Sequence, residues 1–242
     1  MKHRNITAVV DAGNTAIKLA IFKNDALVKV LHTEDMVLQP LIDALFPDED
    51  YDTAICSVRS EKDTAELAAS FNNPFIIDSH TPVPFKNNYK AETLGTDRLA
   101  NAAFLYENCP TSAGVTIDIG TCIKFDILHL EKGYLGGSIS PGIDLRYKAL
   151  NDYTGKLPLL SGKGTTDLVG TDTTTSIQSG VINGMKAEIE GLIAAYSKRF
   201  SDLTFFVTGG DAKNFDIHSK NNIFADENLT LRGIYKIFKH HA

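Results

Sequence analysis

Hydrophobic and polar residues alternate over short stretches near the start of the chain, a pattern typical of β-strands. Three such stretches, at 6–10, 16–22 and 27–31, are separated by the turn-forming pairs Gly13-Asn14 and Asn24-Asp25 and predict a three-stranded meander. The elements expected next are a helix at 40–46, a strand at 53–57, a helix within 61–71, a strand at 74–78, a loop at 81–90 and a helix at 96–106.

The second half restarts this pattern after residue 112. Three further strands are expected at 115–119, 122–129 and 134–140, with a Gly-Thr turn between the first two. They are followed by a helix at 144–150, a loop at 151–172, a long helix at 174–200 with one apolar face, a strand at 203–207 and a helix at 228–240. We therefore expect two α/β lobes, at 1–112 and 113–242, that face each other across a cleft.

Charge and cysteine content limit the partners and the compartment. The 242 residues include 24 Lys and Arg and 30 Asp and Glu, and no basic run could follow a nucleic-acid backbone, so nucleic acid is not expected as a partner. Three widely spaced cysteines indicate a reducing compartment, here the cytoplasm. The apolar stretch at 6–10 is too short for a signal peptide or a membrane span.

Two segments share one design: an apolar strand, then Asp-x-Gly, then a small polar residue. They are Val9–Thr15 and Thr116–Thr121, which we call the first and second phosphate turns. The glycine permits a tight turn close to a phosphate, and the neighbouring N–H groups and the Thr hydroxyl can donate to phosphate oxygens. Either segment alone could be an ordinary hairpin turn. Lys18 could add positive charge, although strand alternation does not decide which face of the sheet its side chain lies on.

Other phosphate-binding patterns are missing from the sequence. Ser161-Gly162-Lys163-Gly164 lacks both the upstream glycine and the final hydroxyl residue of a P-loop, and no Gly-x-Gly-x-x-Gly follows a strand. P-loop and dinucleotide-binding folds are therefore poor candidates.

Three further segments can be interpreted in two ways. Gly95-Thr96-Asp97-Arg98 could be a charged first helical turn, or Asp97 could accept a proton while Arg98 grips an anionic substrate group. Gly136–Ile143 and Thr208–Ala212 could be plain connectors after strands, or glycine surfaces that let a ligand approach closely.

In this order the motifs resemble type III pantothenate kinases, a family of the superfamily of acetate and sugar kinases, heat-shock ATPases and actin. The resemblance spans nearly the whole chain. It rests on Asp11-x-Gly13-Asn14-Thr15-x-x-Lys18, Gly95-x-Asp97-Arg98, Asp118-x-Gly120-Thr121, Gly136-Gly137-x-Ile139-x-Pro141-Gly142 and Thr208-Gly209-Gly210. It implies two ribonuclease H-like lobes with mixed sheets flanked by helices, an ATP cleft between them, and transfer of phosphate from ATP to pantothenate, the first step of coenzyme A biosynthesis.

The resemblance also implies roles for individual residues. Asp97 would be the base that deprotonates the primary hydroxyl of pantothenate, Asp11 would help to hold Mg²⁺, and Asp118 would bind a monovalent cation, K⁺ or NH₄⁺. The residues implied to contact ATP are Asp11, Ala12, Gly13, Asn14, Thr15, Ala16, Ile17, Lys18, Thr121, Gly209 and Gly210. Those implied to contact pantothenate are Tyr89, Gly95, Thr96, Asp97, Arg98 and Thr173. Family members are homodimers in which the partner completes the pantothenate pocket, so the helix from 174 is a candidate interface element.

Three positions depart from the family pattern. Lys124 stands where small and hydroxyl residues are more usual, and it could form a local ion pair or alter the contacts to phosphate. Thr96 and Asp211 stand where apolar residues are common. Two alternatives stay open: a kinase of this fold that acts on another small hydroxylated substrate, and an ATP-binding regulatory module without metabolic activity.

Overall fold

The computed structural model describes residues 4–34, 36–45, 49–215 and 222–242, which divide into two compact units. The first unit contains the chain up to Asn108 together with Lys132–Leu135 and Asn228–Ala242. The second contains Cys109–Glu131 and Gly136–Glu227.

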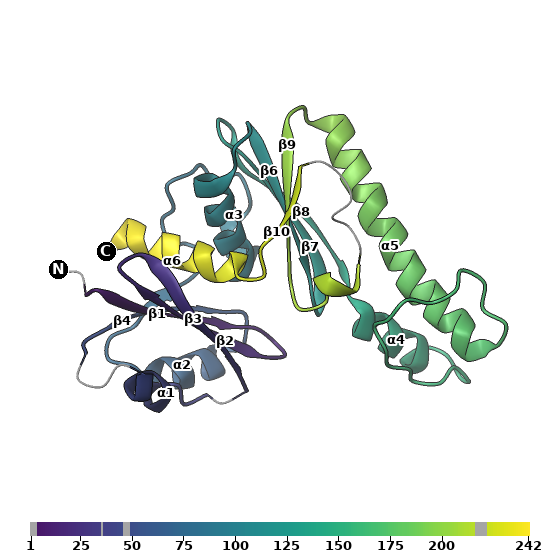
Figure 1. Cartoon of the computed structure of the whole chain (residues 1–242), viewed down its shortest axis with the longest axis horizontal. Coiled ribbons are helices and arrows are strands. Elements are labelled where there is room, and N and C mark those ends of the chain that lie inside the picture. The colour runs from purple at the N-terminus through teal and green to yellow at the C-terminus, as the bar shows by residue number, and fades with distance from the viewer. Residues whose placement is uncertain (1–3, 35, 46–48, 216–221) are drawn as a thin grey trace. The chain divides into compact units, whose positions relative to one another are not determined.

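The first unit is built on a five-stranded sheet in the order β3-β2-β1-β4-β5 (Figure 1). Strand β1 pairs antiparallel with β2 and parallel with β4, so the sheet is mixed, and the predicted meander is confirmed. The strands are β1 (Ile6–Ala12), β2 (Ile17–Lys23), β3 (Ala26–Thr33), β4 (Asp52–Ser57) and β5 (Phe75–Ile77).

Helices cover both faces of this sheet (Figure 1). Alternate residues of β1 and β2, such as Val10 and Leu19, form a buried cluster with Ile42 of α1 and Leu67 of α2. The opposite face is covered by α6, whose Tyr235 ring stacks on Phe22 of β2 at a centroid distance of 4.0 Å. The helices are α1 (Gln39–Leu45), α2 (Glu61–Ala69), the 3-10 helix η1 (Ala91–Thr93), α3 (Thr96–Asn108) and α6 (Leu229–His241). Phe46, the last residue of the predicted first helix, lies outside the described residues.

The C-terminal helix α6 does not belong to the unit in which we expected it. A second domain running from 113 to 242 would contain α6, whereas the structure packs it against α3 of the first unit. The two helices approach so closely that a Cβ on Gly233 would lie 1.9 Å from the carbonyl oxygen of Ala100. Thr230 also donates a hydrogen bond to the Asn101 side chain over 2.9 Å. The expected boundary near 112 lies close to the change of unit after Asn108.

The second unit repeats the topology of the first, with a sheet in the order β10-β9-β6-β7-β8. Its central strand β6 pairs antiparallel with β7 and parallel with β9, as β1 does with β2 and β4. The strands are β6 (Ala113–Ile119), β7 (Cys122–His129), β8 (Gly133–Pro141), β9 (Leu203–Thr208) and β10 (Ile223–Ala225). The restart of the pattern after residue 112 is therefore a repeat of the fold, and the predicted ribonuclease H-like class with two mixed sheets is confirmed.

Two α-helices and the 3-10 helix η2 (Ala212–Asn214) complete the second unit: α4 (Ile143–Asp152) and the long α5 (Thr173–Arg199) (Figure 1). Helix α5 begins at a capping box, in which the Asp172 side chain accepts from the Thr175 N–H and Thr175 bonds back to the backbone of Asp172. No helix in the described part of the chain is both long enough and apolar enough to cross a membrane.

Candidate active site

The first phosphate turn connects the antiparallel strands β1 and β2. The Gly13 N–H donates to the Ala16 carbonyl over 3.0 Å and closes the turn. Asp11 and Lys18 are direct partners in the strand register, so their side chains lie on the same face of the sheet. The face on which Lys18 lies, which the sequence leaves open, is therefore the face that carries Asp11.

An arginine that the sequence analysis missed supports this turn. The Arg59 Nε donates to the carbonyl of Gly13 over 2.8 Å, and the Val58 N–H donates to Ala12 over 3.1 Å. Both residues follow β4, which runs parallel to β1, so the carboxyl ends of the two strands meet at one edge. Arg59 could not be assigned to this turn from the sequence, because the end of a strand does not show which other strand lies beside it.

We predict that Arg59→Ala raises the KM for ATP roughly tenfold with a smaller change in kcat, because a charged donor holds the phosphate turn in shape. Steady-state kinetics with ATP as the varied substrate measures this effect. Arg59→Lys should recover little, since an ammonium lacks the planar guanidinium geometry. Arg199→Ala, an exposed arginine at the end of α5, is the matched control. An unchanged KM in Arg59→Ala would show that the turn needs no such support.

Asp97 lies in the first turn of α3, at the start of a mostly buried helix. Thr96 fixes this start by donating its hydroxyl to the carbonyl of Ser57 at the end of β4, over 3.0 Å. The Asp97 Oδ1 accepts from the Arg98 N–H over 2.8 Å and lies 2.7 Å from the position that a Cβ on Gly95 would take. Glycine at position 95 therefore leaves the space that the Asp97 carboxylate occupies.

Arg98 and Tyr89, both predicted to contact the substrate, lie together. Arg98 is only 3% exposed, and its guanidinium carbon lies 5.2 Å from the centre of the Tyr89 ring, within the range of a cation–π contact. The loop that carries Tyr89 is fixed by Tyr134, which receives the Asn88 N–H over 3.1 Å and donates its own N–H to Lys86 over 2.8 Å. The structure thus brings the predicted substrate residues at 89 and 95–98 into one region of the first unit.

The second phosphate turn repeats the first one in the second unit. The Gly120 N–H donates to Cys122 over 3.1 Å, and Asp118 and Lys124 are direct cross-strand partners, as Asp11 and Lys18 are in the first turn. The Lys124 ammonium lies 2.7 Å from the Asp118 Oδ2, and the two side chains are 18% and 15% exposed. Of the two alternatives for Lys124, the structure contains the local ion pair.

The two aspartates differ in how well they fit the cations predicted for them. Among residues 4–34, 36–45, 49–215 and 222–242, no cluster of three or more His, Cys, Asp and Glu side chains could hold a metal ion. Mg²⁺ in phosphoryl-transfer sites is usually held by one or two carboxylates plus substrate phosphates, so Asp11 beside a phosphate turn fits that ion. Asp118 does not fit an added monovalent cation in the same way, because an ammonium group already lies against its carboxylate.

Glycines pack the second turn against neighbouring backbone. A Cβ on Gly142 would lie 2.0 Å from the carbonyl oxygen of Gly120, and the Gly142 N–H donates to Thr121 over 3.0 Å. Gly209 has a φ of +99°, and a Cβ there would lie 2.2 Å from the Ile119 carbonyl oxygen. These two glycine segments are therefore more than connectors, since both lie against the turn. At both glycines, the atom that an added Cβ would overlap belongs to the backbone.

Asp211, one of the departures from the family pattern, is tied into the same region. Its N–H donates to Ile119 over 2.9 Å, and its carboxylate accepts from Lys163 over 2.9 Å. Lys163 also pairs with Asp144 over 3.0 Å. Burial acts to lower the pKa of Lys163, but the hydrogen bonds and charges of Asp211 and Asp144 outweigh it and raise the pKa. The loop before α5 is thereby anchored to the Gly209-Gly210 segment by a charged lysine.

Thr173 is the first residue of α5 and belongs to neither phosphate turn. It lines a cavity of about 470 Å³ whose walls come from α4, α5 and the loop between them. Its neighbour Asp172 caps the helix, and the hydrogen bond from the Thr175 N–H lowers the pKa of that carboxyl. The lining residues are Leu150, Leu157, Thr173, Ser176, Ile177 and Gly180.

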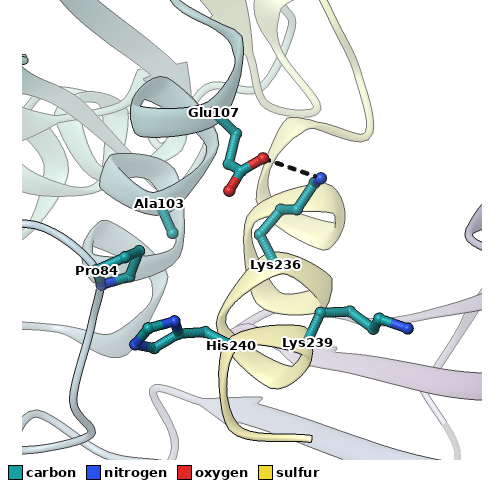
Figure 2. A pocket seen from close by; sticks show the side chains of 6 residues that line it. All are labelled: Pro84, Ala103, Glu107, Lys236, Lys239 and His240. Atoms are coloured by element: carbon teal, nitrogen blue, oxygen red, sulfur yellow. Dashed lines mark hydrogen bonds and ion pairs between the residues drawn. The ribbon is translucent and has the colours of Figure 1, made fainter. Parts of the chain in front are cut away.

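A second cavity lies in the first unit between α3 and α6 (Figure 2). Its volume of about 170 Å³ is below the range of roughly 300–1,000 Å³ that is usual for small-molecule sites. The Glu107 and Lys236 side chains pair at its rim over 3.1 Å (Figure 2). None of the predicted site residues line it, so it is not a candidate for the active site.

The predicted site residues therefore fall into two groups. The first unit contains the phosphate turn from Asp11 to Lys18, Tyr89 and the segment from Gly95 to Arg98. The second contains Asp118 and Thr121, the pair Gly209-Gly210 beside them, and Thr173 on α5. Chemically, these groups offer two backbone turns suited to phosphate, a carboxylate beside a buried arginine, and an aspartate paired with a lysine.

Comparison with known proteins identifies close sequence relatives. A family model described as type III pantothenate kinase matches residues 8–195. The type III pantothenate kinase of Bacteroides fragilis is 37% identical over 236 residues, covering 96% of this chain and 97% of that protein. That of Christiangramia forsetii is 38% identical over 235 residues, covering 93% and 95%.

Solved structures share the fold at lower identity. A Campylobacter jejuni protein described as a Baf family transcriptional activator superposes with a TM-score of 0.62 at 22% identity, covering 97% of this chain and 98% of that one. A Listeria monocytogenes protein described as an N-acetylmannosamine kinase gives a TM-score of 0.51 at 11% identity, covering 98% and 100%. At these identities the similarity shows a common fold alone.

Proposed function

Because the chain belongs to the type III pantothenate kinase family, it is an ATP-dependent pantothenate kinase, and we propose that Asp97 is its catalytic base. The reaction makes 4′-phosphopantothenate in coenzyme A biosynthesis. It uses ATP and a divalent metal. The observation that carries the proposal for Asp97 is its position at the start of α3, next to the buried Arg98 that stacks on Tyr89.

The proposed reaction is an in-line transfer. The primary hydroxyl oxygen of pantothenate forms a bond to the γ-phosphorus while the bond from that phosphorus to the β,γ-bridging oxygen breaks, and ADP leaves. The Asp97 carboxylate takes the hydroxyl proton, and Arg98 holds the pantothenate carboxylate against the Tyr89 ring. Asp11 would be the protein ligand of Mg²⁺, which would neutralise phosphate charge when bound.

The phosphate turns position the nucleotide in this proposal. Backbone N–H groups from Ala12 to Thr15 and the Thr121 hydroxyl donate to phosphate oxygens, and Lys18 adds a positive charge on the face that carries Asp11. The glycine surface at Gly209-Gly210 receives the adenosine part. Phosphoryl transfer depends mainly on such positioning and charge neutralisation, so these groups supply most of the rate enhancement.

An acceptor panel tests the choice of substrate. We expect the purified protein to release ADP with pantothenate and at a background rate with sugars, glycerol and hydroxy acids that lack the pantothenate amide. A faster rate with another acceptor would favour a kinase of the same fold with a different substrate. ATP binding without turnover on any acceptor would favour the regulatory alternative.

We further propose that the chain forms a homodimer through the region around the start of α5, with the partner adding to the pantothenate pocket beside Thr173. Large exposed apolar side chains grouped in the loop before α5 support this, because grouped apolar side chains mark interaction sites, whereas single ones are normal on monomeric proteins. They are Tyr153, Leu159, Leu168 and Val169, which are 89%, 64%, 79% and 75% exposed.

Leu168→Glu tests the dimer. Burying an unpaired carboxylate at the interface should weaken self-association about tenfold or more, as measured by light scattering across a concentration series. Val28→Glu, which changes an apolar side chain 53% exposed in the first unit, is the matched control and should leave the mass unchanged. A monomeric parent protein, or a Leu168→Glu variant that associates as the parent does, would contradict this interface.

A cytoplasmic location is also proposed. Cys56 is buried, Cys109 and Cys122 are partly buried, and none of these three described residues forms a disulfide, which agrees with a reducing compartment. The substrates ATP and pantothenate are also small metabolites of that compartment.

A further inference from the structure

We propose that Lys124 is a built-in cation for the second phosphate turn, so that this enzyme needs no K⁺ or NH₄⁺ at Asp118. The inference rests on the proposed function, because it assigns Lys124 a role in the same phosphoryl transfer. In chemical terms the lysine head group is an alkylammonium ion tethered at the place where the sequence resemblance implies a free monovalent cation.

The geometry of the hairpin fixes this ammonium in place. Asp118 near the end of β6 and Lys124 near the start of β7 are direct partners in the antiparallel register, so their side chains share one face of the sheet. Lys124 Nζ lies 2.7 Å from Asp118 Oδ2, and the side chains are only 18% and 15% exposed. Limited exposure reduces screening by water, so this pair holds its geometry better than a surface ion pair does.

The position of the pair relates it to the chemistry of the turn. Only Ile119 to Ile123 separate the two residues, and this stretch contains Gly120, the glycine of the turn, and Thr121, a predicted ATP contact. An uncompensated Asp118 carboxylate so close to the turn would repel the phosphates of ATP. A cation at Asp118 removes that repulsion, and the Lys124 ammonium does so without an ion from solution.

The first unit has the same register of an aspartate opposite a lysine, whereas the 2.7 Å ion pair belongs to the second unit. Asp11 and Lys18 are opposite each other across β1 and β2, as Asp118 and Lys124 are across β6 and β7. Because the two units repeat one topology, each phosphate turn of this chain has one aspartate and one lysine at equivalent places on its hairpin. The ion pair with Asp118 fixes the lysine charge at the second turn, which leaves Asp11 of the first turn to serve as the predicted Mg²⁺ ligand.

The test compares turnover in buffers with different monovalent cations. We expect the parent protein to release ADP at rates that differ less than about twofold when K⁺ is replaced by tetramethylammonium. Lys124→Gln should lose about 10- to 100-fold in tetramethylammonium, the scale of one lost electrostatic group, and should recover most of that loss in K⁺ or NH₄⁺. Lys124→Arg should remain independent of K⁺, and Lys186→Gln, an exposed lysine of α5, should behave as the parent.

Thallium(I) provides a readout that does not depend on catalysis, because it substitutes for K⁺ and is visible by NMR. With ADP present, a bound thallium signal should be found for Lys124→Gln and be missing for the parent protein. If Lys124→Gln does not fold, the inference is tested on the parent protein alone. Its turnover in the different monovalent cations and its thallium spectrum then show whether it binds K⁺.

Two results would overturn the inference. One is a parent enzyme whose turnover rises tenfold or more with K⁺. The other is a folded Lys124→Gln variant that neither binds thallium nor is rescued by K⁺ or NH₄⁺, which would make Lys124 a direct phosphate contact or a structural residue. Failure of the proposed function would look different from both results, because no salt would then give pantothenate-dependent ADP release. The thallium experiment would still report whether a monovalent cation binds.

Discussion

Asp97→Asn is expected to lower turnover by about 10²-fold or more while the affinity for ATP stays nearly unchanged, because it removes a general base and keeps the shape of the side chain. The asparagine Oδ1 can still accept the Arg98 N–H bond that Asp97 receives over 2.8 Å, so the start of α3 should be preserved. Stopped assays of ADP release give kcat, and calorimetric titration with an ATP analogue gives the affinity.

The matched control for this change is Asp50→Asn, which alters an exposed aspartate of the same unit. It should leave kcat within about twofold of the parent, since surface changes away from a site have small effects. Turnover of Asp97→Asn within a few-fold of the parent would contradict the assignment of the base. A large loss of ATP affinity in that variant would instead point to a structural role for Asp97.

The second large effect is expected at Gly209, the first of two adjacent glycines. Gly209→Ala should lower the free energy of unfolding by about 2–5 kcal/mol, because an L-residue is strained at positive φ and its Cβ would overlap backbone. The φ at Gly209 is +99°, and the Cβ would lie 2.2 Å from the Ile119 carbonyl oxygen, which cannot move without shifting the end of β6. That strand end leads directly into the second phosphate turn, so ATP binding should weaken as well.

Gly210→Ala is the internal control, since nothing lies within 4 Å of a Cβ at that position. Urea unfolding of the two variants should therefore separate them clearly, with Gly210→Ala within about 0.5 kcal/mol of the parent. Equal stability of the two variants would show that the approach of Gly209 to Ile119 is not required. A loss of ATP affinity in Gly210→Ala at unchanged stability would support direct contact with the nucleotide at that residue.

Much of the fold could be predicted from local patterns. Short apolar runs, which alternate with polar residues in the first three strands, predicted every strand except β10. Each predicted helix and strand begins and ends within two residues of the observed one. Strand β10 (Ile223–Ala225) is too short to show a period, and its pairing with β9 depends on the tertiary fold. The duplication was visible because each lobe begins with a hairpin around an Asp-x-Gly turn.

The unit to which α6 belongs could not be predicted in this way. An amphipathic pattern tells which face of a helix is buried, but the partner surface is set by shape. Here the partner is chosen by details such as Gly233 against Ala100 and Tyr235 stacked on Phe22. Sequence position alone would place the helix with the strands that precede it.

The candidate site shows the same division between local and long-range information. The phosphate turns and the Gly-x-Asp-Arg segment could be found as motifs, since glycine and short polar residues have specific backbone uses. Arg59 could not, because its contact with Gly13 spans 46 residues of sequence. Lys124 was visible only as an unusual residue until the register placed it opposite Asp118.

The most direct measurement of the central claim is the identification of the products of one reaction mixture. The purified protein, ATP, Mg²⁺ and pantothenate should yield ADP and 4′-phosphopantothenate in equal amounts, and Asp97→Asn should yield both about 10²-fold more slowly. ADP formed at the same rate without pantothenate, or without any phosphorylated pantothenate in the mass spectrum, would contradict it.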